Sequence, residues 1–230
     1  MYTLTDVTKT YRKGRRSVTA LEDLNLSIAP GEWLAVQGRT GSGKTTLLQL
    51  LGALDHPSRG VINFDGRDLA RLPEADLTDV RAASIGFVFQ TFNLIPTLSA
   101  QDNVEAALIP LRLSADQRRA RASEALASVG LAERANHLPS ELSGGQQQRV
   151  GIARALVKAP SVLLADEPTG NLDVDTRDEI MALLEALWRD RGLTLVLVTH
   201  DTSIACRAQR VAVMRDGHLS IAPDEQRAQA

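Results

Sequence analysis

Short apolar runs, rich in β-branched residues, recur along the chain and alternate with segments of helical periodicity. Runs of this kind predict strands, which we expect at residues 24–28, 33–37, 61–64, 85–89, 162–165, 193–198 and 211–214. The runs 162–165 and 195–198 are continuously apolar. That pattern is typical of strands buried on both faces, as in a parallel sheet covered by helices.

Three intervening segments, 44–53, 146–158 and 174–190, have apolar residues at helical spacing. The last of them places one apolar face on Ile180, Leu183, Leu184, Leu187 and Trp188. Strands alternating with helices predict an α/β fold with a mostly parallel sheet flanked by helices.

The stretch 101–138 differs because it is rich in Ala, Arg, Glu and Leu and contains no strand signal. We expect it to form a helical lobe, at about residues 91–143, inserted in a single domain that spans residues 1–222. Residues 223–230 form a polar tail, which we expect to be frayed.

Length, charge and cysteine content narrow the class of protein. The 230 residues suffice for one sizeable domain, and the net charge of −2 gives no electrostatic reason to expect nucleic acid as the main partner. The single cysteine, Cys206, cannot form an internal disulfide, which fits a reducing compartment. No apolar run approaches the roughly 18 residues that span a bilayer, so work at a membrane would require another anchor.

A glycine-rich motif follows the strand predicted at 33–37. It reads Gly38, Arg39, Thr40, Gly41, Ser42, Gly43, Lys44 and Thr45, and it fits G-x-x-x-x-G-K-[ST]. Its glycines let backbone N–H groups and the next helix N-terminus point at phosphates. Lys44 adds charge at the β- and γ-phosphates, Thr45 offers a hydroxyl to Mg²⁺, and Thr46 joins the ATP-binding residues. The strand before it and the apolar helix after it disfavour the alternative, a glycine-rich turn with an exposed lysine.

Two carboxylates, Asp166 and Glu167, directly follow the apolar run 162–165. In open α/β sheets, ligands bind at the carboxyl ends of the strands. We expect Asp166 to hold Mg²⁺ and Glu167 to orient and deprotonate the attacking water. The alternative, a solvated acidic turn before Pro168, loses weight beside a phosphate loop.

A second small, glycine-rich loop, residues 142–146, leads into the helix predicted at 146–158 and contains Ser143, Gly144, Gly145 and Gln146. The same backbone geometry makes it an anion cradle, which lacks a lysine. Ser143 also fits a helix N-cap, and the two roles are compatible.

Four further residues are weak signals when each is taken alone. Gln90 and His200 each follow a predicted strand, where they can meet Mg²⁺, the lytic water or the γ-phosphate, or serve as ordinary loop residues. Asp173 ends the segment 170–173. Tyr11, in a short basic segment, suits adenine stacking and a strand-edge position equally.

In this order the motifs resemble the ATP-binding cassette (ABC) ATPases over nearly the whole chain. Tyr11 resembles the A-loop, 38–45 the Walker A motif, Gln90 the Q-loop, 142–146 the signature motif, 162–167 the Walker B motif, 170–173 the D-loop and His200 the H-switch. The resemblance implies a P-loop NTPase core with an N-terminal antiparallel β subdomain.

The family resemblance also implies partners. Ser143, Gly144, Gly145, Gln146 and Asp173 would act in trans on ATP held by a second copy or a paralogue, in a head-to-tail dimer. The helical lobe and the segment after Gln90 would contact a membrane permease, at the cytoplasmic face of a bacterial membrane. Residues 89–98 and 167–173 resemble the macrolide-export, lipoprotein-release and cell-division branch. Arg39 and Thr40 depart from the usual Pro-Ser of that branch, at positions where the backbone matters most.

The sequence disfavours two other classes of protein that share the phosphate loop. A soluble ATPase of the same family that acts on ribosomes or DNA usually has two cassettes or a long coiled-coil insertion, and this chain has neither. A P-loop kinase of small molecules is disfavoured by the signature loop and by Glu167.

Overall fold

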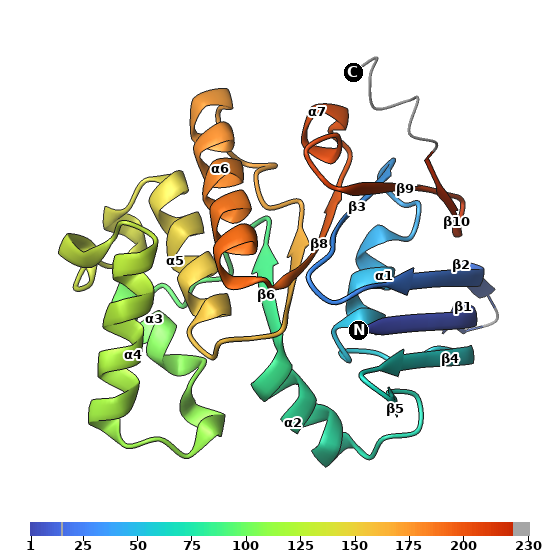
Figure 1. Ribbon diagram of the computed structural model, residues 1–230, viewed down its shortest axis with the longest axis horizontal. Coiled ribbons are helices and arrows are strands. Elements are labelled where there is room, and N and C mark those ends of the chain that lie inside the picture. Colours follow the sequence, from blue (N-terminus) through green and yellow to red (C-terminus); the bar gives the residue numbers. More distant parts are fainter. Residues whose placement is uncertain (15, 223–230) are drawn as a thin grey trace. The chain divides into compact units, whose positions relative to one another are not determined.

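Two units make up the chain in the computed structural model, which describes residues 1–14 and 16–222 (Figure 1). The first unit contains residues 1–78 together with the described residues from 194 onward. The second contains residues 79–193. The polar tail predicted at 223–230 lies outside the described residues, and the single domain predicted at 1–222 stays a prediction.

The first unit holds parallel strands whose residues are mostly buried. Strand β3 (Trp33–Gly38) lies between β8 (Thr194–Thr199) and β9 (Arg210–Arg215), and all three are parallel. Strand β10 (His218–Ile221) pairs antiparallel with β9. Every residue of β8 is buried, so its continuous apolar run marks a strand covered on both faces, as the sequence predicts. Helices α1 (Lys44–Leu51) and α7 (Thr202–Ala205) follow β3 and β8.

The same unit contains an antiparallel sheet with the strand order β2-β1-β4-β5. These strands are β1 (Tyr2–Lys13), β2 (Arg16–Ile28), β4 (Arg59–Phe64) and β5 (Arg67–Asp68). The apolar runs at 24–28 and 61–64 predicted only parts of two of them. The expected N-terminal antiparallel sheet is present, and it is longer than those runs indicated.

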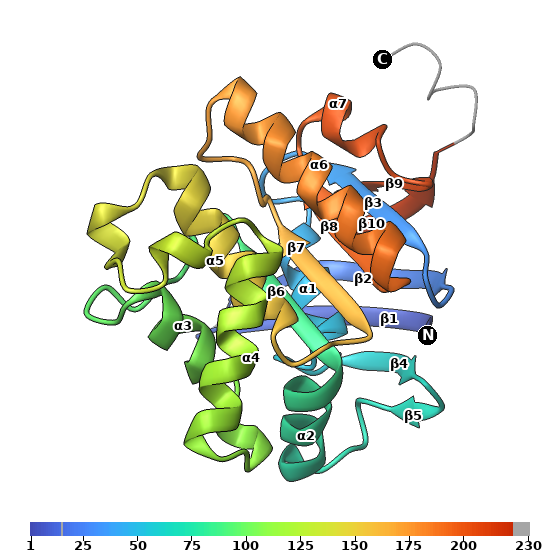
Figure 2. The ribbon, with the colours of Figure 1, turned by 60° about the vertical axis from the view of Figure 1, so that its left-hand side comes forward.

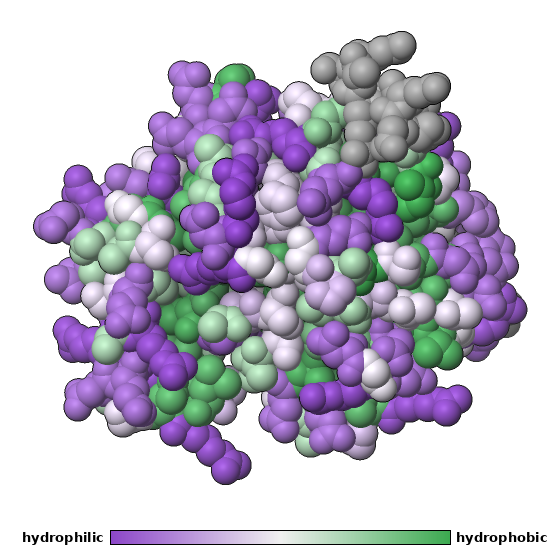
Figure 3. Space-filling model, in the orientation of Figure 1, coloured by the Kyte–Doolittle hydropathy of each residue, from purple (hydrophilic) through white to green (hydrophobic). Residues whose placement is uncertain are grey.

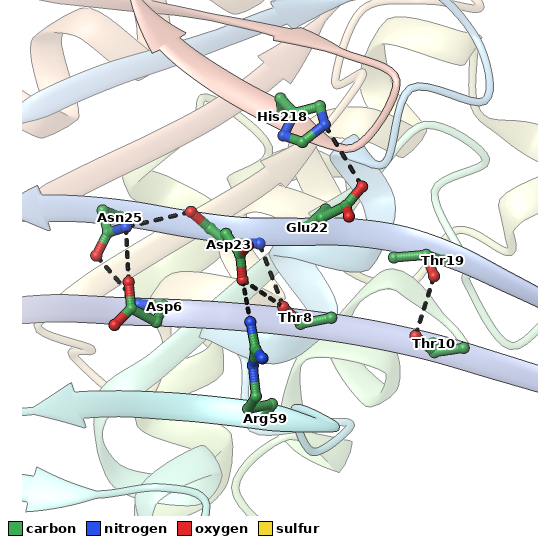
Figure 4. A network of polar contacts seen from close by, with 9 residues as sticks. All are labelled: Asp6, Thr8, Thr10, Thr19, Glu22, Asp23, Asn25, Arg59 and His218. Carbon is green, nitrogen blue, oxygen red and sulfur yellow. Dashed lines mark hydrogen bonds and ion pairs between the residues drawn. The ribbon is translucent and has the colours of Figure 1, made fainter.

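Side chains replace part of the backbone pairing where β1 departs from regular register. Asp6 and Asp23 have positive φ angles of 49° and 46°, and the β1–β2 register shifts between Leu4 and Lys9. Asn25 Oδ1 accepts a hydrogen bond from the Asp6 amide at 3.0 Å, and Asp23 forms an ion pair with Arg59 (Figure 4). These contacts satisfy polar groups at the bulges, which ordinary strand pairing would leave open.

The second unit contains two parallel strands and a group of helices. Strand β6 (Ile85–Phe89) pairs with β7 (Val162–Asp166), and Phe89 lies opposite Asp166. Helix α2 (Glu74–Ser84), which the apolar pattern did not predict, precedes β6, and only its residues 79–84 belong to this unit. Helix α6 (Val174–Arg191) follows β7 and buries Ile180, Leu184 and Leu187 of its predicted apolar face.

Helices occupy the stretch in which a lobe is predicted. Helices α3 (Ala100–Ala106) and α4 (Ala115–Ser128) contact each other and α5 (Gly144–Leu156) (Figure 2). Short 3-10 turns at Ile109–Leu111, Ala132–Arg134 and Pro139–Glu141 connect them. Capping boxes start α3 at Ser99, α4 at Ser114 and α5 at Ser143. The hydroxyl of each cap accepts a backbone N–H that the helix leaves free, which explains why the helices begin at these serines.

Hydrophilic residues dominate the surface over the antiparallel strands on the face shown in Figure 3. Hydrophobic residues show there only in small, separate groups. Among the described residues, no helix is both long enough and apolar enough to cross a bilayer.

Candidate functional site

The loop between β3 and α1 adopts a conformation that only glycine permits at two positions. Gly43 is the N-cap of α1, with a φ of 108°, and a Cβ there would lie 2.5 Å from the Ala20 carbonyl oxygen. A Cβ on Gly38 would lie 2.5 Å from the Met214 carbonyl oxygen. Positive φ and close backbone approach both exclude a side chain. The spacing of these glycines in the sequence therefore reports the shape of the loop.

Lys44 is folded into this loop. Its side chain is buried, with 6% of its surface exposed, and Nζ donates to the carbonyl oxygens of Gly38 at 2.7 Å and Arg39 at 3.2 Å. Among the described residues, no side chain caps the amino end of α1. The loop thus combines backbone N–H groups at a helix N-terminus with one ammonium group, which is the arrangement that binds phosphate.

The remaining loop residues differ in exposure. Arg39, Thr40, Gly41 and Thr45 are exposed, whereas Ser42 is 7% exposed. The exposure of residues 39–41 fits a loop in which the backbone N–H groups, and not the side chains, bind phosphate.

His200 lies at the same edge of the sheet as the phosphate loop. In the parallel register, Gln37 of β3 lies opposite Thr199 of β8. Because β3 ends at Gly38 and β8 ends at Thr199, Gly38 and His200 lie at the same level at the carboxyl edge of these strands. The His200 side chain is exposed, and Asp201 caps the following helix α7.

Tyr11 lies beside helix α1 and is 39% exposed. Its hydroxyl donates to Asp55 Oδ2 at 3.1 Å and to Gln49 Oε1 at 3.4 Å. Burial raises the pKa of Tyr11, the side-chain hydrogen bond with Thr46 opposes that rise, and Asp55 adds to it. Thr46 directly follows the phosphate loop and is predicted to bind ATP. The fold therefore places Tyr11, the predicted adenine-stacking residue, next to that loop.

The second unit gathers its predicted residues at the carboxyl edge of β6 and β7. Phe89 pairs with Asp166, so Gln90 and Glu167 follow at one level. Glu167 has a φ of 47°, an unusual value for a residue with a side chain, and its carbonyl accepts the Gly170 amide at 3.0 Å. Backbone strain of this kind is concentrated at functional sites.

Gln90 is held against the segment 170–173. Its Nε2 donates to Asn171 Oδ1 at 3.2 Å, and Asn171 Nδ2 donates back to the Gln90 carbonyl at 3.1 Å. This reciprocal pair links the end of β6 to the turn that follows Glu167.

Two residues predicted to act in trans, Ser143 and Asp173, are the N-caps of helices α5 and α6. Ser143 is exposed and caps α5, where its Oγ accepts the Gln146 amide at 3.3 Å and Gln146 Oε1 accepts the Ser143 amide at 2.9 Å. Asp173 caps α6 through the Thr176 amide at 3.0 Å and the Thr176 hydroxyl at 2.7 Å. The hydrogen bonds from Thr176 lower the pKa of Asp173. Ser143 is therefore a helix cap, as the sequence predicts.

Two further polar side chains of α5 tie this region together, and sequence reasoning missed them. Gln148 is fully buried, and its Nε2 donates to the Pro168 carbonyl. Arg154 donates to the carbonyls of Phe92 at 2.7 Å and Asn93 at 2.5 Å. A polar residue on the buried side of the predicted helix 146–158 is the signal that points to such contacts.

The proposed magnesium ligands have suitable chemistry. Thr45, Gln90 and Asp166 all supply oxygen, and Mg²⁺ is commonly held by one or two carboxylates together with phosphate oxygens. Among the described residues, no group of three or more His, Cys, Asp or Glu residues forms a metal site by itself. The oxygen donors of Thr45, Gln90 and Asp166 fit the chemistry of a Mg²⁺ ion that also binds phosphate oxygens.

A strand, a glycine-rich loop with a folded-in lysine and a helix N-terminus define a P-loop nucleotide-binding protein. The ABC transporter family model matches residues 21–170, and the chain belongs to that family. Within the family it is an ATP-binding ATPase.

The relatives place the chain more narrowly. It is 48% identical to the lipoprotein-releasing system ATP-binding protein LolD of Geobacter metallireducens, over 93% of this chain and 95% of LolD. It is 50% identical to the macrolide export ATP-binding/permease protein MacB of Rhodopseudomonas palustris, over 90% of this chain but only 32% of MacB. The macrolide-export and lipoprotein-release parts of the predicted branch are thus confirmed.

A solved structure confirms the fold class. It is a dimeric, post-hydrolysis state of the ATP-binding cassette MJ0796 bound to ADP and Pi, and MJ0796 comes from Methanocaldococcus jannaschii. The two folds superpose with a TM-score of 0.88 at 45% identity, over 96% of this chain and 97% of the other.

Proposed function

We propose that this chain is the motor of a membrane complex, in which two cassettes close head to tail on two Mg-ATP molecules and drive a permease. The second cassette is another copy or a paralogue. The observation that carries the proposal is the pair of cradles. One has Lys44 folded into it, and the other, at Ser143 and Gly144, starts a helix without a lysine.

Two incomplete cradles suit one phosphate chain shared between subunits. Ser143, Gly144, Gly145 and Gln146 present a capped helix start, with Asp173 at the neighbouring start of α6. These residues would contact ATP held by residues 38–46 of the other cassette. The dimeric state of the MJ0796 structure supports this arrangement.

Each remaining residue has a role in hydrolysis under this proposal. Tyr11 stacks on adenine, Glu167 orients and deprotonates the attacking water, and His200 contacts the γ-phosphate. Thr45, Gln90 and Asp166 would hold Mg²⁺, which would offset the negative charge of the phosphates.

The permease contact is proposed at a cavity of the second unit. It has a volume of about 240 Å³ and is lined by Phe87, Phe89, Asn93, Ala107, Arg154, Ala155 and Lys158. The Phe87 and Phe89 rings stack at 5.6 Å, and the two basic side chains stand beside them. An apolar segment with an acidic residue would complement this cavity. Such docking would hold the chain at the cytoplasmic face of the membrane, with no nucleic acid involved.

The test is phosphate release together with membrane recovery. Lys44→Met removes the ammonium at the phosphate loop and is expected to abolish hydrolysis. Asp79→Asn, on the exposed side of α2, is the control. Co-expression with a candidate permease of the macrolide-export or lipoprotein-release type should move this chain to the membrane fraction. Recovery with ribosomes instead would favour the soluble alternative.

A further inference from the structure

A partly buried ion pair contacts the side chain of Tyr11. The Lys9 ammonium donates to Asp55 Oδ1 at 2.5 Å, and the other oxygen of this carboxylate accepts the Tyr11 hydroxyl at 3.1 Å. Lys9 Nζ also lies 4.9 Å from the centroid of the Tyr11 ring. The three side chains therefore form a closed cycle of contacts.

This cycle is more deeply buried than an ordinary surface ion pair. The Lys9 side chain is 12% exposed and that of Asp55 is 30% exposed. Lys9 Nζ makes a second hydrogen bond, to the His56 carbonyl at 2.7 Å. Burial alone would raise the pKa of Asp55, but the hydrogen bonds from Lys9, the His56 amide and Tyr11 lower it. The carboxylate is thus ionised at neutral pH, and its Oδ2 accepts the Tyr11 hydroxyl at 3.1 Å, a shorter contact than the 3.4 Å from that hydroxyl to Gln49 Oε1.

These contacts determine how the Tyr11 ring is oriented and which of its two faces a ligand can reach. The hydroxyl contact anchors the far end of the side chain, which stops rotation about its χ angles. The Lys9 ammonium lies over one face of the ring. A planar ligand can therefore stack only on the opposite face, and Tyr11 as a whole residue is 39% exposed. A ring held in its binding orientation loses less entropy when a ligand stacks on it.

We propose that Lys9 and Asp55 are positioning residues for the nucleotide base, because they hold Tyr11 in the orientation that stacks on adenine. The inference rests on the proposed function, since it needs ATP to be the ligand. It assigns the two residues to recognition of the base, and it leaves the phosphates to residues 38–46.

The test separates base binding from phosphate binding. Mg-ATP and inorganic tripolyphosphate are titrated by calorimetry into the wild-type chain and the variants Tyr11→Phe, Asp55→Ala and Lys9→Met. Tyr11→Phe keeps the stacking face of the ring and removes only the hydroxyl, with its hydrogen bonds to Asp55 and Gln49, so it guards against misfolding. Asp79→Asn is the matched control.

The expected loss in Mg-ATP affinity is about threefold to tenfold for Tyr11→Phe and about tenfold for Asp55→Ala, which are values typical of one or two lost hydrogen bonds. Tripolyphosphate affinity should not change, because residues 38–46 bind the phosphates whether or not the base is stacked. The double variant Tyr11→Phe/Asp55→Ala should bind ATP as Asp55→Ala does, because both changes remove one contact.

Equal losses for ATP and tripolyphosphate would overturn the inference, since they would show a general disturbance of the phosphate loop. Unchanged ATP affinity in both Tyr11→Phe and Asp55→Ala would overturn the inference as well. Failure of the wild-type chain to bind Mg-ATP at all would refute the proposed function itself, which is a separate result.

Discussion

Gly145 and Thr176 are so close that a Cβ atom on residue 145 would lie 2.4 Å from Thr176 Cγ2. The same Thr176 donates its hydroxyl and its amide to Asp173, the cap of α6. The starts of α5 and α6 are therefore packed directly on each other. Any shift of one moves the cap of the other, and both belong to the surface that we propose to contact the second cassette.

Gly145→Ala is expected to lower the free energy of unfolding by about 1–3 kcal/mol, because overpacking forces Thr176 away from Asp173. Urea denaturation measures this effect. The second change Thr176→Ser removes the obstructing methyl group and keeps the hydroxyl, so Gly145→Ala/Thr176→Ser should recover most of the lost stability. Gly144→Ala is the matched control, since its Cβ would meet the flexible end of Leu172 at 3.3 Å and Phe92 Cζ at 3.9 Å, neither of which is closer than 3.0 Å. Equal losses for the two alanine variants would contradict the packing argument.

Arg154 fastens the segment after Gln90 to helix α5. Its two hydrogen bonds go to the carbonyls of Phe92 and Asn93, which both have positive φ angles, of 60° and 50°. Such a backbone persists only where surrounding contacts hold it.

Arg154→Met is expected to lower the free energy of unfolding by about 1.5–3 kcal/mol, the range for hydrogen bonds from a charged group. It should also slow ATP hydrolysis, because Gln90 precedes the released segment. Arg154→Lys, which can reach one of the two carbonyls, should have a stability and a hydrolysis rate between those of the wild type and Arg154→Met. Arg121→Met, on the exposed side of α4, is the control for loss of a positive charge. If Arg154→Met hydrolyses ATP at the wild-type rate, Arg154 does not position Gln90.

Lys158 gives the protein a pH-dependent stability. Burial lowers the pKa of its ammonium group to about 8, below the value of about 10.4 for an unfolded chain. Between these two values the unfolded state binds more protons, so the stability of the folded state rises with pH. Below pH 8 the cost of the buried charge is fully present.

The stability of Lys158→Met relative to the wild type should therefore be greater at pH 7 than at pH 10.5, by about 1–2 kcal/mol after allowance for partial exposure of the side chain. Loss of the hydrogen bond from Lys158 Nζ to the Arg81 carbonyl, 2.6 Å long, lowers the stability of the variant at both pH values. The relative stability of the variant should fall between about pH 8 and pH 10.5. Urea titrations of both proteins across that range measure the difference. A difference that stays constant with pH would show that the Lys158 ammonium is not desolvated.

The sequence was most informative where one local rule decided the structure. The strand Ile85–Phe89 begins and ends where its apolar run does, and α6 differs from its predicted range by one residue at its carboxyl end. Strand β1 was missed because bulges at Asp6 and beyond interrupt the alternation of buried and exposed residues. Helix α2 was missed because its residues are mostly exposed, which leaves a weak apolar face.

The sequence motifs predicted which residues lie at the same strand ends. They could not predict the long-range side-chain contacts that hold those residues in place. The pairing of Phe89 with Asp166 brings Gln90 and Glu167 to one level, as two strand ends predict. The tether of Tyr11 to Asp55 spans 44 residues, and no local pattern reports a contact of that separation. The roles of Glu167, His200, Gln90 and Asp173 in catalysis stay predictions.

The most direct test of the central claim is the mass of the Glu167→Gln variant in solution with Mg-ATP. Removal of the base should stop the attack of water and leave ATP between two cassettes. Light scattering coupled to size exclusion should then show the mass of one chain without nucleotide and of two chains with ATP. Glu167→Gln/Lys44→Met, which lacks the phosphate-loop ammonium, should stay at one chain. If Glu167→Gln binds ATP and stays at one chain, the shared site does not exist.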